Sequence, residues 1–384
     1  ISSSTFAAMK NITLLTILFS ITLPSFAQKK LIKKMLSNEI DTTRRPSFMP
    51  IPVLGYSQET GFEFGLGGLF SMYMDRKDTL NRSSNFSLMS SVSTKKQYNF
   101  TLRNDIYTRQ NKFHLMGELI FRRNPFNFYG IGNKTHHADE NKLLEKQFKI
   151  LLEAEKSLIP YTYTGVSIGY ENYSYTDRGN GGIFATNPNI HGKNGGDLVY
   201  IGASQSYDTR NSNNYPTKGF FGRVTYQFAP QVFSSNEFNT SQIKVTVSNF
   251  WPLANRLVLG VNGFYHTVQS KNTPFYLLPQ LGNDEMMRGY YRGRYRDENL
   301  ITAQTELRYR FTNRFGLVAF AGAGRVFANG DFSLKYLKPT YGGGGRYFFD
   351  PAKGLSVRLD YGIGEKPPHE KRQSGFYISL AEAF

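Results

Sequence analysis

The chain contains no cysteine and only one tryptophan in 384 residues. The lack of cysteine excludes disulfides and thiolate metal sites, and it also excludes lipid anchoring through an amino-terminal cysteine. After residue 27 no apolar run approaches the roughly twenty residues that a helical membrane span requires. Aromatic residues nevertheless make up 15% of the chain. A chain of this kind can cross a bilayer only as a closed barrel, in which every backbone amide is paired.

The amino terminus predicts export from the cytoplasm. Lys10 and the uncharged stretch 12–26 form a basic and an apolar region, and Ser25 and Ala27 are the small residues that a signal peptidase reads. Met9 is the expected start of translation. We therefore expect four parts: mis-assigned upstream residues 1–8, a signal peptide at 9–27, a short basic periplasmic segment at 28–47 and an outer-membrane barrel at 48–384.

The last nine residues alternate as a strand between lipid and a barrel lumen would. Phe376, Ile378, Leu380 and Phe384 put large apolar side chains on one face, which we expect to be the lipid face. Glu382 interrupts that face near the chain end, where a carboxylate at the membrane interface costs only about 0 to 1 kcal/mol.

The same alternation recurs along the chain. Between Leu355 and Ile363 the apolar positions alternate with Arg358 and Asp360, which places two charges on the lumen side. The fold class is therefore all-β, a transmembrane antiparallel β-barrel with about sixteen strands. The expected strands are 48–57, 61–75, 84–94, 97–108, 112–122, 146–157, 161–175, 197–207, 217–229, 238–250, 254–269, 297–310, 314–328, 338–349, 353–364 and 374–384.

The formal net charge of +17 could indicate a nucleic-acid-binding protein, but the chain has an export signal and no basic helix. We expect no nucleic-acid partner. Lipopolysaccharide phosphates, anionic lipid headgroups and a charged lumen are the expected counterparts of the positive charge, with a merely solvated surface as the alternative.

Several segments in the second half of the chain together resemble the bacterial surface antigen superfamily, which includes BamA-like insertases, TamA-like assembly factors and two-partner secretion translocators. Residues 206–211 and 215–221 resemble its mid-barrel motif, and Met287-Arg-Gly-Tyr resembles its arginine-glycine-aromatic motif. Residues 318–327, 355–364 and 375–384 resemble three of its carboxy-terminal strands. A terminal aromatic such as Phe384 also resembles the signal that the cell's barrel assembly machinery reads.

The resemblance implies that Arg288, Gly289 and Tyr290 lie on a long extracellular loop that folds into the lumen. A loop of this length in a compact barrel suggests a task, and a sixteen-stranded barrel is too wide for side chains alone to fill. The family usually provides an aspartate partner for the arginine, but the matching position here is Gly322.

The remaining lumenal candidates for pairing with Arg288 are Asp360 and Glu306, and Arg358 competes for either one. In the mid-barrel motif, Asp208 and Arg210 flank a turn closed by Pro216 and Gly219. A structural salt bridge or aspartate turn is the expected role of that motif.

The expected function follows from the resemblance: assistance to outer-membrane protein insertion, assembly or translocation, in the outer membrane of a Gram-negative bacterium. The chain shows no polypeptide-transport-associated domain ahead of the barrel, so recognition and delivery of a client would have to come from a periplasmic partner or be absent. The alternative is a passive plugged pore or a structural surface barrel. No enzymatic activity, cofactor or metal is expected, because the histidines lack an accompanying nucleophile motif and His136 and His137 lie in a loop that would hold a metal poorly.

Overall fold

Sixteen strands follow one another around a single antiparallel sheet, as the alternation predicted. The structure is a computed structural model that describes residues 37–57, 61–179, 181–233 and 238–384. The expected upstream residues, the signal peptide and most of the basic segment lie outside the described residues. The strands of the sheet are β1 (Ser47–Ser57), β2 (Gly61–Tyr73), β3 (Ser83–Ser93), β4 (Tyr98–Tyr107), β5 (Phe113–Phe128), β6 (Asn141–Ile159), β7 (Thr162–Asp177), β8 (Gly195–Asp208), β9 (Gly219–Ala229), β10 (Thr240–Ala254), β11 (Leu257–Gln269), β14 (Asn299–Tyr309), β15 (Phe315–Phe327), β16 (Lys338–Asp350), β17 (Leu355–Ile363) and β18 (Ser374–Leu380).

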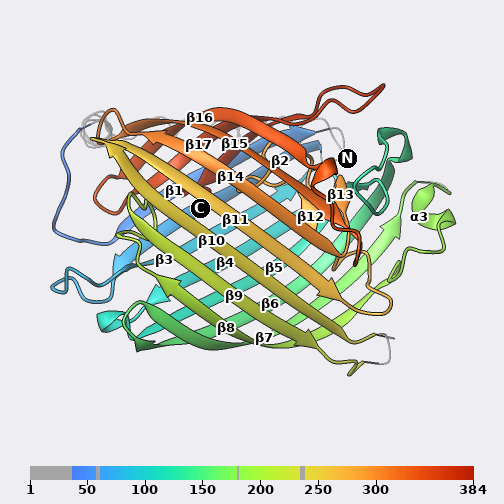
Figure 1. Cartoon of the computed structure of the whole chain (residues 1–384), viewed down its shortest axis with the longest axis horizontal. Coiled ribbons are helices and arrows are strands. Elements are labelled where there is room, and N and C mark those ends of the chain that lie inside the picture. Colours follow the sequence, from blue (N-terminus) through green and yellow to red (C-terminus); the bar gives the residue numbers. More distant parts are fainter. Residues whose placement is uncertain (1–36, 58–60, 180, 234–237) are drawn as a thin grey trace, which may run out of the picture.

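Each strand pairs with its neighbours in sequence, and the sheet curls into a barrel with tilted strands (Figure 1). Short turns such as 160–161 and 255–256 lie at one end, and the long connections, including 178–194 and 270–298, lie at the other. Outer-membrane barrels have short periplasmic turns and longer extracellular loops. We therefore take the short-turn end, on the left in Figure 1, as the periplasmic end.

Helical elements are few and short in the described residues. They are α3 (Ile183–Thr186), η1 (Arg109–Asn111), η2 (His137–Asp139) and η3 (Leu334–Tyr336), all in connections. Within the described ranges, no helix is long and apolar enough to cross a membrane.

Polar and apolar side chains separate onto the two faces of the sheet. On β14, Leu307 and Tyr309 are 42% and 48% exposed on the outer face, whereas Glu306 and Arg308 are completely buried inside. Apolar groups on the outside and charges within match a wall between lipid and lumen.

Two strands are longer than the sequence predicted. We expected a loop from 123 to 145, but β5 continues to Phe128 and β6 begins at Asn141. Across the two strands, Arg122 Nε donates to Glu145 Oε1 at 2.8 Å, and a lumenal ion pair of this kind is compatible with a strand.

The end of the chain corrects the expected lipid-facing position of Phe384. Strand β18 stops at Leu380, and Ala381 adopts φ of 62°, which breaks the alternation. Glu382 then turns inward, where Arg346 Nε donates to it at 2.8 Å. The ring of Phe384 packs 5.9 Å from that of Phe250. The carboxylate that seemed out of place on a lipid face is thus a lumenal ion-pair partner.

Candidate functional site

The long connection after β11 enters the barrel and reaches the inner faces of β14, β17 and β18. This segment, residues 270–298, contains the short strands β12 (Gln280–Leu281) and β13 (Tyr295–Arg296), which pair with each other. Its first part packs with the opposite wall, and the ring centroid of Phe275 lies 5.5 Å from that of Phe128. We call residues 270–298 the plug. The buried cluster at the extracellular mouth comprises Phe128, Leu143, Tyr173, Phe184, Ile190, Leu198, Tyr200, Ala229 and Phe275–Leu278.

Arg288 lies at the tip of the plug and is completely buried. Its Nη1 donates to Asp360 Oδ2 at 2.6 Å, and its Nη2 donates to Glu306 Oε1. The guanidinium also lies 3.6 Å from the ring centroid of Phe320. The sequence left Asp360 and Glu306 as alternatives, and the structure brings both to the arginine at once. Buried charges of this kind stabilise a structure only when all of them are paired.

Three further arginines complete this charge network. Arg346 donates to Asp360 Oδ1 at 2.6 Å, and Arg358 contacts Asp360 Oδ2 at 3.2 Å. Arg308 donates to Glu306 at 2.8 Å. Arg358 also donates to Asp284 of the plug at 2.8 Å, so it does not displace Arg288. Four arginines therefore face four carboxylates: Asp284, Glu306, Asp360 and Glu382.

Gly322 lies on β15 between Gln304 and Thr340 of the neighbouring strands. A Cβ at this position would lie 2.6 Å from the carbonyl oxygen of Ala303, so even a small side chain would require a shift of the wall. An aspartate does not fit here as the backbone stands. Asp360 and Glu306 supply the negative charge from the neighbouring strands instead.

Gly289 and Tyr290 hold the plug against the last strands. Gly289 has φ of 104°, and a Cβ there would lie 2.8 Å from the backbone of Gly362. Only glycine suits this conformation and this close approach. The Gly289 amide donates to the Tyr377 hydroxyl at 2.8 Å, and the Tyr290 hydroxyl donates to Pro339 O at 2.6 Å. The plug is thus attached to β16 and β18 as well as to the charge network.

The mid-barrel motif forms a strap across the periplasmic mouth. We use this name for residues 209–218, the connection between β8 and β9. Asp208 accepts from Arg210 and from Arg82 near β3, each at 2.8 Å. Asn214 Nδ2 donates to Ser83 Oγ at 2.9 Å and to Lys353 O at 3.0 Å. Asp208 and Arg210 thus form the expected salt bridge, but the strap also joins both ends of the sheet, which the sequence did not indicate.

Pro216 and Gly219 close the strap. Pro216 is buried, and Gly219 has φ of 107° with its backbone against Thr209. A side chain at position 219 would meet the Thr209 carbonyl, so glycine is required where the chain re-enters the sheet.

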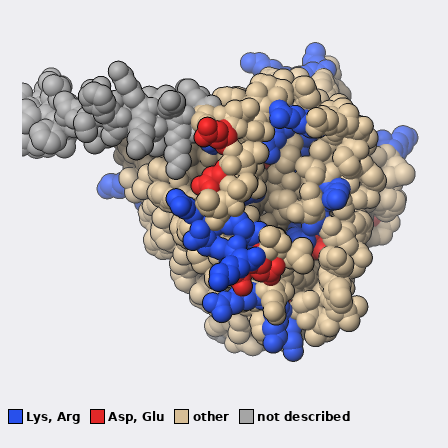
Figure 2. Space-filling model, turned by 90° about the vertical axis from the view of Figure 1, so that its left-hand side faces the viewer, with Lys and Arg blue, Asp and Glu red and all other residues tan. Residues whose placement is uncertain are grey.

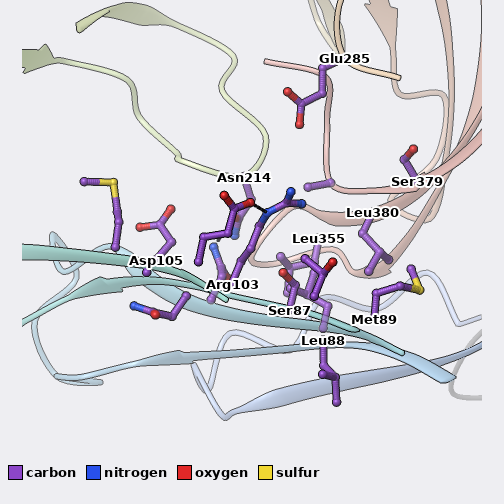
Figure 3. Close-up of a pocket in the computed structure, with 18 of the residues that line it drawn as sticks. Ser87, Leu88, Met89, Arg103, Asp105, Asn214, Glu285, Leu355, Ser379 and Leu380 are labelled. Carbon is purple, nitrogen blue, oxygen red and sulfur yellow. Dashed lines mark hydrogen bonds and ion pairs between the residues drawn. The ribbon is translucent and has the colours of Figure 1, made fainter. Parts of the chain in front are cut away.

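A cavity of about 660 Å³ lies between the plug and the wall formed by β3 to β6 (Figure 3). Asp284 and Glu285 line it from the plug tip, and Arg103 lines it from β4, where it pairs with Glu118 at 2.7 Å. Ser379 and Leu380 line it from β18. The cavity therefore extends from the barrel wall to the last strand.

The first and last strands leave a seam in the sheet. Within the described residues, β1 pairs only with β2, and β18 pairs only with β17. Strand β1 contains Pro50 and Pro52, which the sequence alone did not mark as functional. Two prolines two residues apart in a strand-like segment are typical of a sheet edge, because proline cannot donate to a ladder.

Lys and Arg gather on the periplasmic end of the barrel (Figure 2). The ion pairs at this end use Asp208 and Asp350, which are partly or fully buried. Among the described residues, the exposed carboxylates here are Glu39 and Asp41, and Asp75 and Asp78 in the turn between β2 and β3 are half-buried. The exposed cations in the turns and strand ends, none of which forms an ion pair with a described residue, are Arg45, Arg76, Lys77, Arg109, Lys112, Lys156, Lys218 and Arg256. We call these eight residues the basic face.

The lumenal histidine His114 of β5 joins side chains of the two neighbouring strands, β4 and β6. His114 Nε2 lies 2.6 Å from Asp105 and its Nδ1 lies 3.0 Å from Glu155. Its ring stacks on Tyr107 with 4.1 Å between centroids. Both ring nitrogens are therefore occupied by carboxylates. Within the described ranges, no group of three histidines, aspartates or glutamates is placed to hold a metal ion.

These features define an outer-membrane β-barrel whose lumen is closed by an inward-folded loop. The chain belongs to the Omp85 superfamily, because the model of the Omp85 superfamily domain matches residues 54–384. This confirms the resemblance seen in the sequence. No curated protein matches the chain.

Solved structures show the same fold. BamA from Haemophilus ducreyi lacking POTRA domains 1-3 is 14% identical with a TM-score of 0.52, and the match covers 88% of this chain and 70% of that one. CdiB from Escherichia coli is 10% identical with a TM-score of 0.54, covering 88% and 62%. CdiB from Acinetobacter baumannii is 8% identical with a TM-score of 0.53, covering 88% and 59%. The chain thus spans about 60% of the length of either CdiB chain.

Proposed function

We propose that this chain is an outer-membrane barrel of a Gram-negative bacterium that assists the insertion of other barrel proteins through its seam. The observation that carries the proposal is the lack of pairing between β1 and β18 within the described residues. An open edge presents unpaired backbone groups, to which an incoming strand can add. Membership of the Omp85 superfamily, and the likeness of its fold to BamA and CdiB, agree with this role.

The lumen supports the same proposal. The cavity reaches Ser379 and Leu380 of β18, so a segment inside the lumen can approach the seam. The plug closes the extracellular mouth, which keeps such a segment from passing outward. The route that this arrangement favours is sideways into the lipid. We propose no enzymatic activity, since the charged side chains around Arg288 pair with one another.

A reversible lock across the seam tests the proposal. Because the chain has no cysteine, pairs of cysteines placed between residues 49–53 and 376–380 form unique disulfides. The measurement is the folding rate of an eight-stranded test barrel into liposomes that contain the purified protein. We expect the oxidised lock to abolish the acceleration and a reductant to restore it.

The control lock joins two strands that are already paired, through Val247→Cys and Gly263→Cys on β10 and β11. This lock should leave the acceleration unchanged. Equal acceleration with an open and a locked seam contradicts the insertase proposal.

We also propose that an acidic periplasmic protein docks on the basic face and delivers clients. The eight exposed cations lie in turns and strand ends at the periplasmic end, near exposed aromatics such as Trp251 and Tyr161. Aromatic side chains of this kind mark the membrane interface, so charges beyond them face the periplasm. Complementary charge steers a partner and sets its orientation.

A fluorescent polyglutamate peptide tests the charge of this face on barrels in nanodiscs of zwitterionic lipid. We expect binding that weakens as salt rises and that falls at least tenfold when Lys77, Lys218 and Arg256 are changed to glutamate. The matched control changes Lys134 and Lys193 of the extracellular loops. Binding only to vesicles that contain phosphatidylglycerol would instead assign the face to lipid.

A passive plugged pore is the second candidate function. The completely buried Arg288 pair with Asp360 and Glu306 favours it, because a fixed plug suits a structure that only sets permeability. The seam lock separates the two candidate functions. Locking the seam should abolish insertion by an insertase, whereas it should leave the conductance of a passive pore unchanged.

A further inference from the structure

We propose that the free edge of β18, and not that of β1, is the template to which a client strand adds. This inference rests on the proposed insertion function. The client segment is an amphipathic strand that runs antiparallel to β18. The two edges of the seam differ in their backbone donors and in their attachment to the plug.

Prolines within the other strands show where this sheet tolerates a missing donor. Pro125 of β5 pairs with β6 but lies beyond Arg123, where the ladder with β4 ends. Pro252 of β10 pairs with β11 but lies beyond Phe250, where the ladder with β9 ends. Each proline thus occurs where one neighbouring strand is missing.

Pro339 of β16 follows the same rule. It pairs with Ala323 of β15, whereas the ladder with β17 begins only at Tyr341. At all three positions the proline nitrogen, which carries no hydrogen, can face the side of the strand that has no paired neighbour. Prolines within strands are confined to such positions.

Pro50 and Pro52 differ because they lie in the middle of a fully paired strand. They oppose Gly68 and Leu66 in a ladder that runs without interruption from Ser47 to Ser57. N–H groups two residues apart point to the same side of a strand. The other strand prolines face a side without a paired neighbour. By the same rule, the nitrogens of Pro50 and Pro52 face the free side of β1, which therefore lacks two N–H donors. A strand that adds there loses two backbone hydrogen bonds.

Strand β18 has the opposite properties. Its residues Ser374–Leu380 include no proline, so its free edge keeps every donor. The Tyr377 hydroxyl accepts from the Gly289 amide at 2.8 Å, and Ser379 Oγ donates to Asp284 at 2.6 Å. The plug therefore holds β18 in place from inside. A fixed edge binds an incoming strand at a lower entropic cost than a mobile one.

The direction of β18 selects the client segment. The strand runs from the extracellular loop 364–373 toward the periplasm, so its antiparallel partner runs outward from the periplasm. In a barrel with both ends in the periplasm, odd-numbered strands run this way. Phe376 and Ile378 are 65% and 64% exposed on the lipid side of β18. The client strand fits when its apolar residues face the same side.

Disulfide mapping compares the two edges directly. Phe48 of β1 and Ile378 of β18 are equally exposed at 64%, so Phe48→Cys and Ile378→Cys form a matched pair of single-cysteine variants. The probe is an eight-stranded test barrel stalled by a folded domain fused to one end, with one cysteine moved along its first or its last strand. The full-length chain is used in liposomes.

We expect Ile378→Cys to crosslink to the first strand of the probe, with a single best register. The yield at Phe48→Cys should be lower by roughly fivefold to a hundredfold, as the loss of two backbone hydrogen bonds predicts. Equal yields at both edges, a preference for Phe48→Cys, or no crosslink at either edge while insertion proceeds would each overturn the inference.

Restoring the donors gives a second, independent test. In the double variant Pro50→Ala with Pro52→Ala, crosslinking at Phe48→Cys should rise toward the level at Ile378→Cys. Pro339→Ala restores a donor away from the seam and should change neither yield. If no variant accelerates folding of the probe, and the wild type does not either, the proposed function fails. Acceleration with crosslinks confined to β1 leaves that function intact and refutes only the choice of edge.

Discussion

Arg288 joins the plug to two strands of the wall, so its removal affects both. Arg288→Ala leaves Asp360 and Glu306 with fewer partners in a dry site, which destabilises the docked plug by about 3–5 kcal/mol. In planar bilayers we expect larger or more frequent conductance steps than in the wild type. Charge reversal at Asp360 or Glu306 should act in the same way. Arg76→Ala on the basic face is the control and should leave conductance unchanged.

The opposite result would place Arg288 in solvent. Wild-type conductance in Arg288→Ala, together with ready labelling of Arg288→Cys by a reagent added outside the cell, would contradict the buried position.

Asp297 gives the plug a dependence on pH. It lies in the connection just before β14, and burial raises the pKa of its carboxyl to about 6, although the hydrogen bond from the Glu298 amide lowers this pKa by a smaller amount. A raised pKa in the folded state means that ionisation opposes folding. The docked plug should therefore be most stable below pH 4 and lose stability as the pH rises through 6. Conductance of the wild type should increase over this range, and Asp297→Asn should remove the change.

At the scale of elements, the buried arginines of the plug should resist trypsin although they lie on a long loop. Arg288, Arg294 and Arg296 are 0%, 3% and 1% exposed, whereas Lys134 in the loop between β5 and β6 is exposed. Trypsin added to the outside should cut at Lys134, and within the plug at the exposed Lys271 and Arg292, and it should spare the three buried arginines. Mass spectrometry of the fragments measures this. Cleavage at Arg288 in the folded barrel would show that the plug leaves the lumen readily.

The strands were predictable because a barrel wall imposes a period of two, which Leu307 and Arg308 show as clearly as any pair. The inward turn at Ala381 was not predictable, since it depends on Arg346 and the ring of Phe250 across the lumen. Contacts between residues on opposite sides of a lumen leave no local pattern in the sequence.

The candidate site, too, could be predicted from the sequence only in part. Arg288 was identified by a motif, and its two possible partners were narrowed to Asp360 and Glu306 by strand parity. That both bind it together depends on the register of β14 and β17, which parity does not fix. Pro50 and Pro52 were visible in the sequence, but their meaning became clear only from the neighbours of the other strand prolines.

For the whole molecule, the continuous ladder predicts slow unfolding. Complete unfolding requires the breaking of all fifteen contacts between neighbouring strands in the sixteen-stranded order. We expect the unheated protein to migrate faster on a denaturing gel than the boiled protein. A water-soluble preparation that migrates identically before and after boiling would contradict the membrane barrel.

The strap has a consequence for the order in which the chain folds. Asn214 contacts Ser83 and Lys353, which lie 131 and 139 residues away in the sequence. Contacts at such separations form late, because the loops between them must close first. The strap can therefore be completed only after the early and late strands have come together. Asn214→Ala should leave the early folding phases unchanged and remove the last one, which makes this single asparagine a marker of finished assembly.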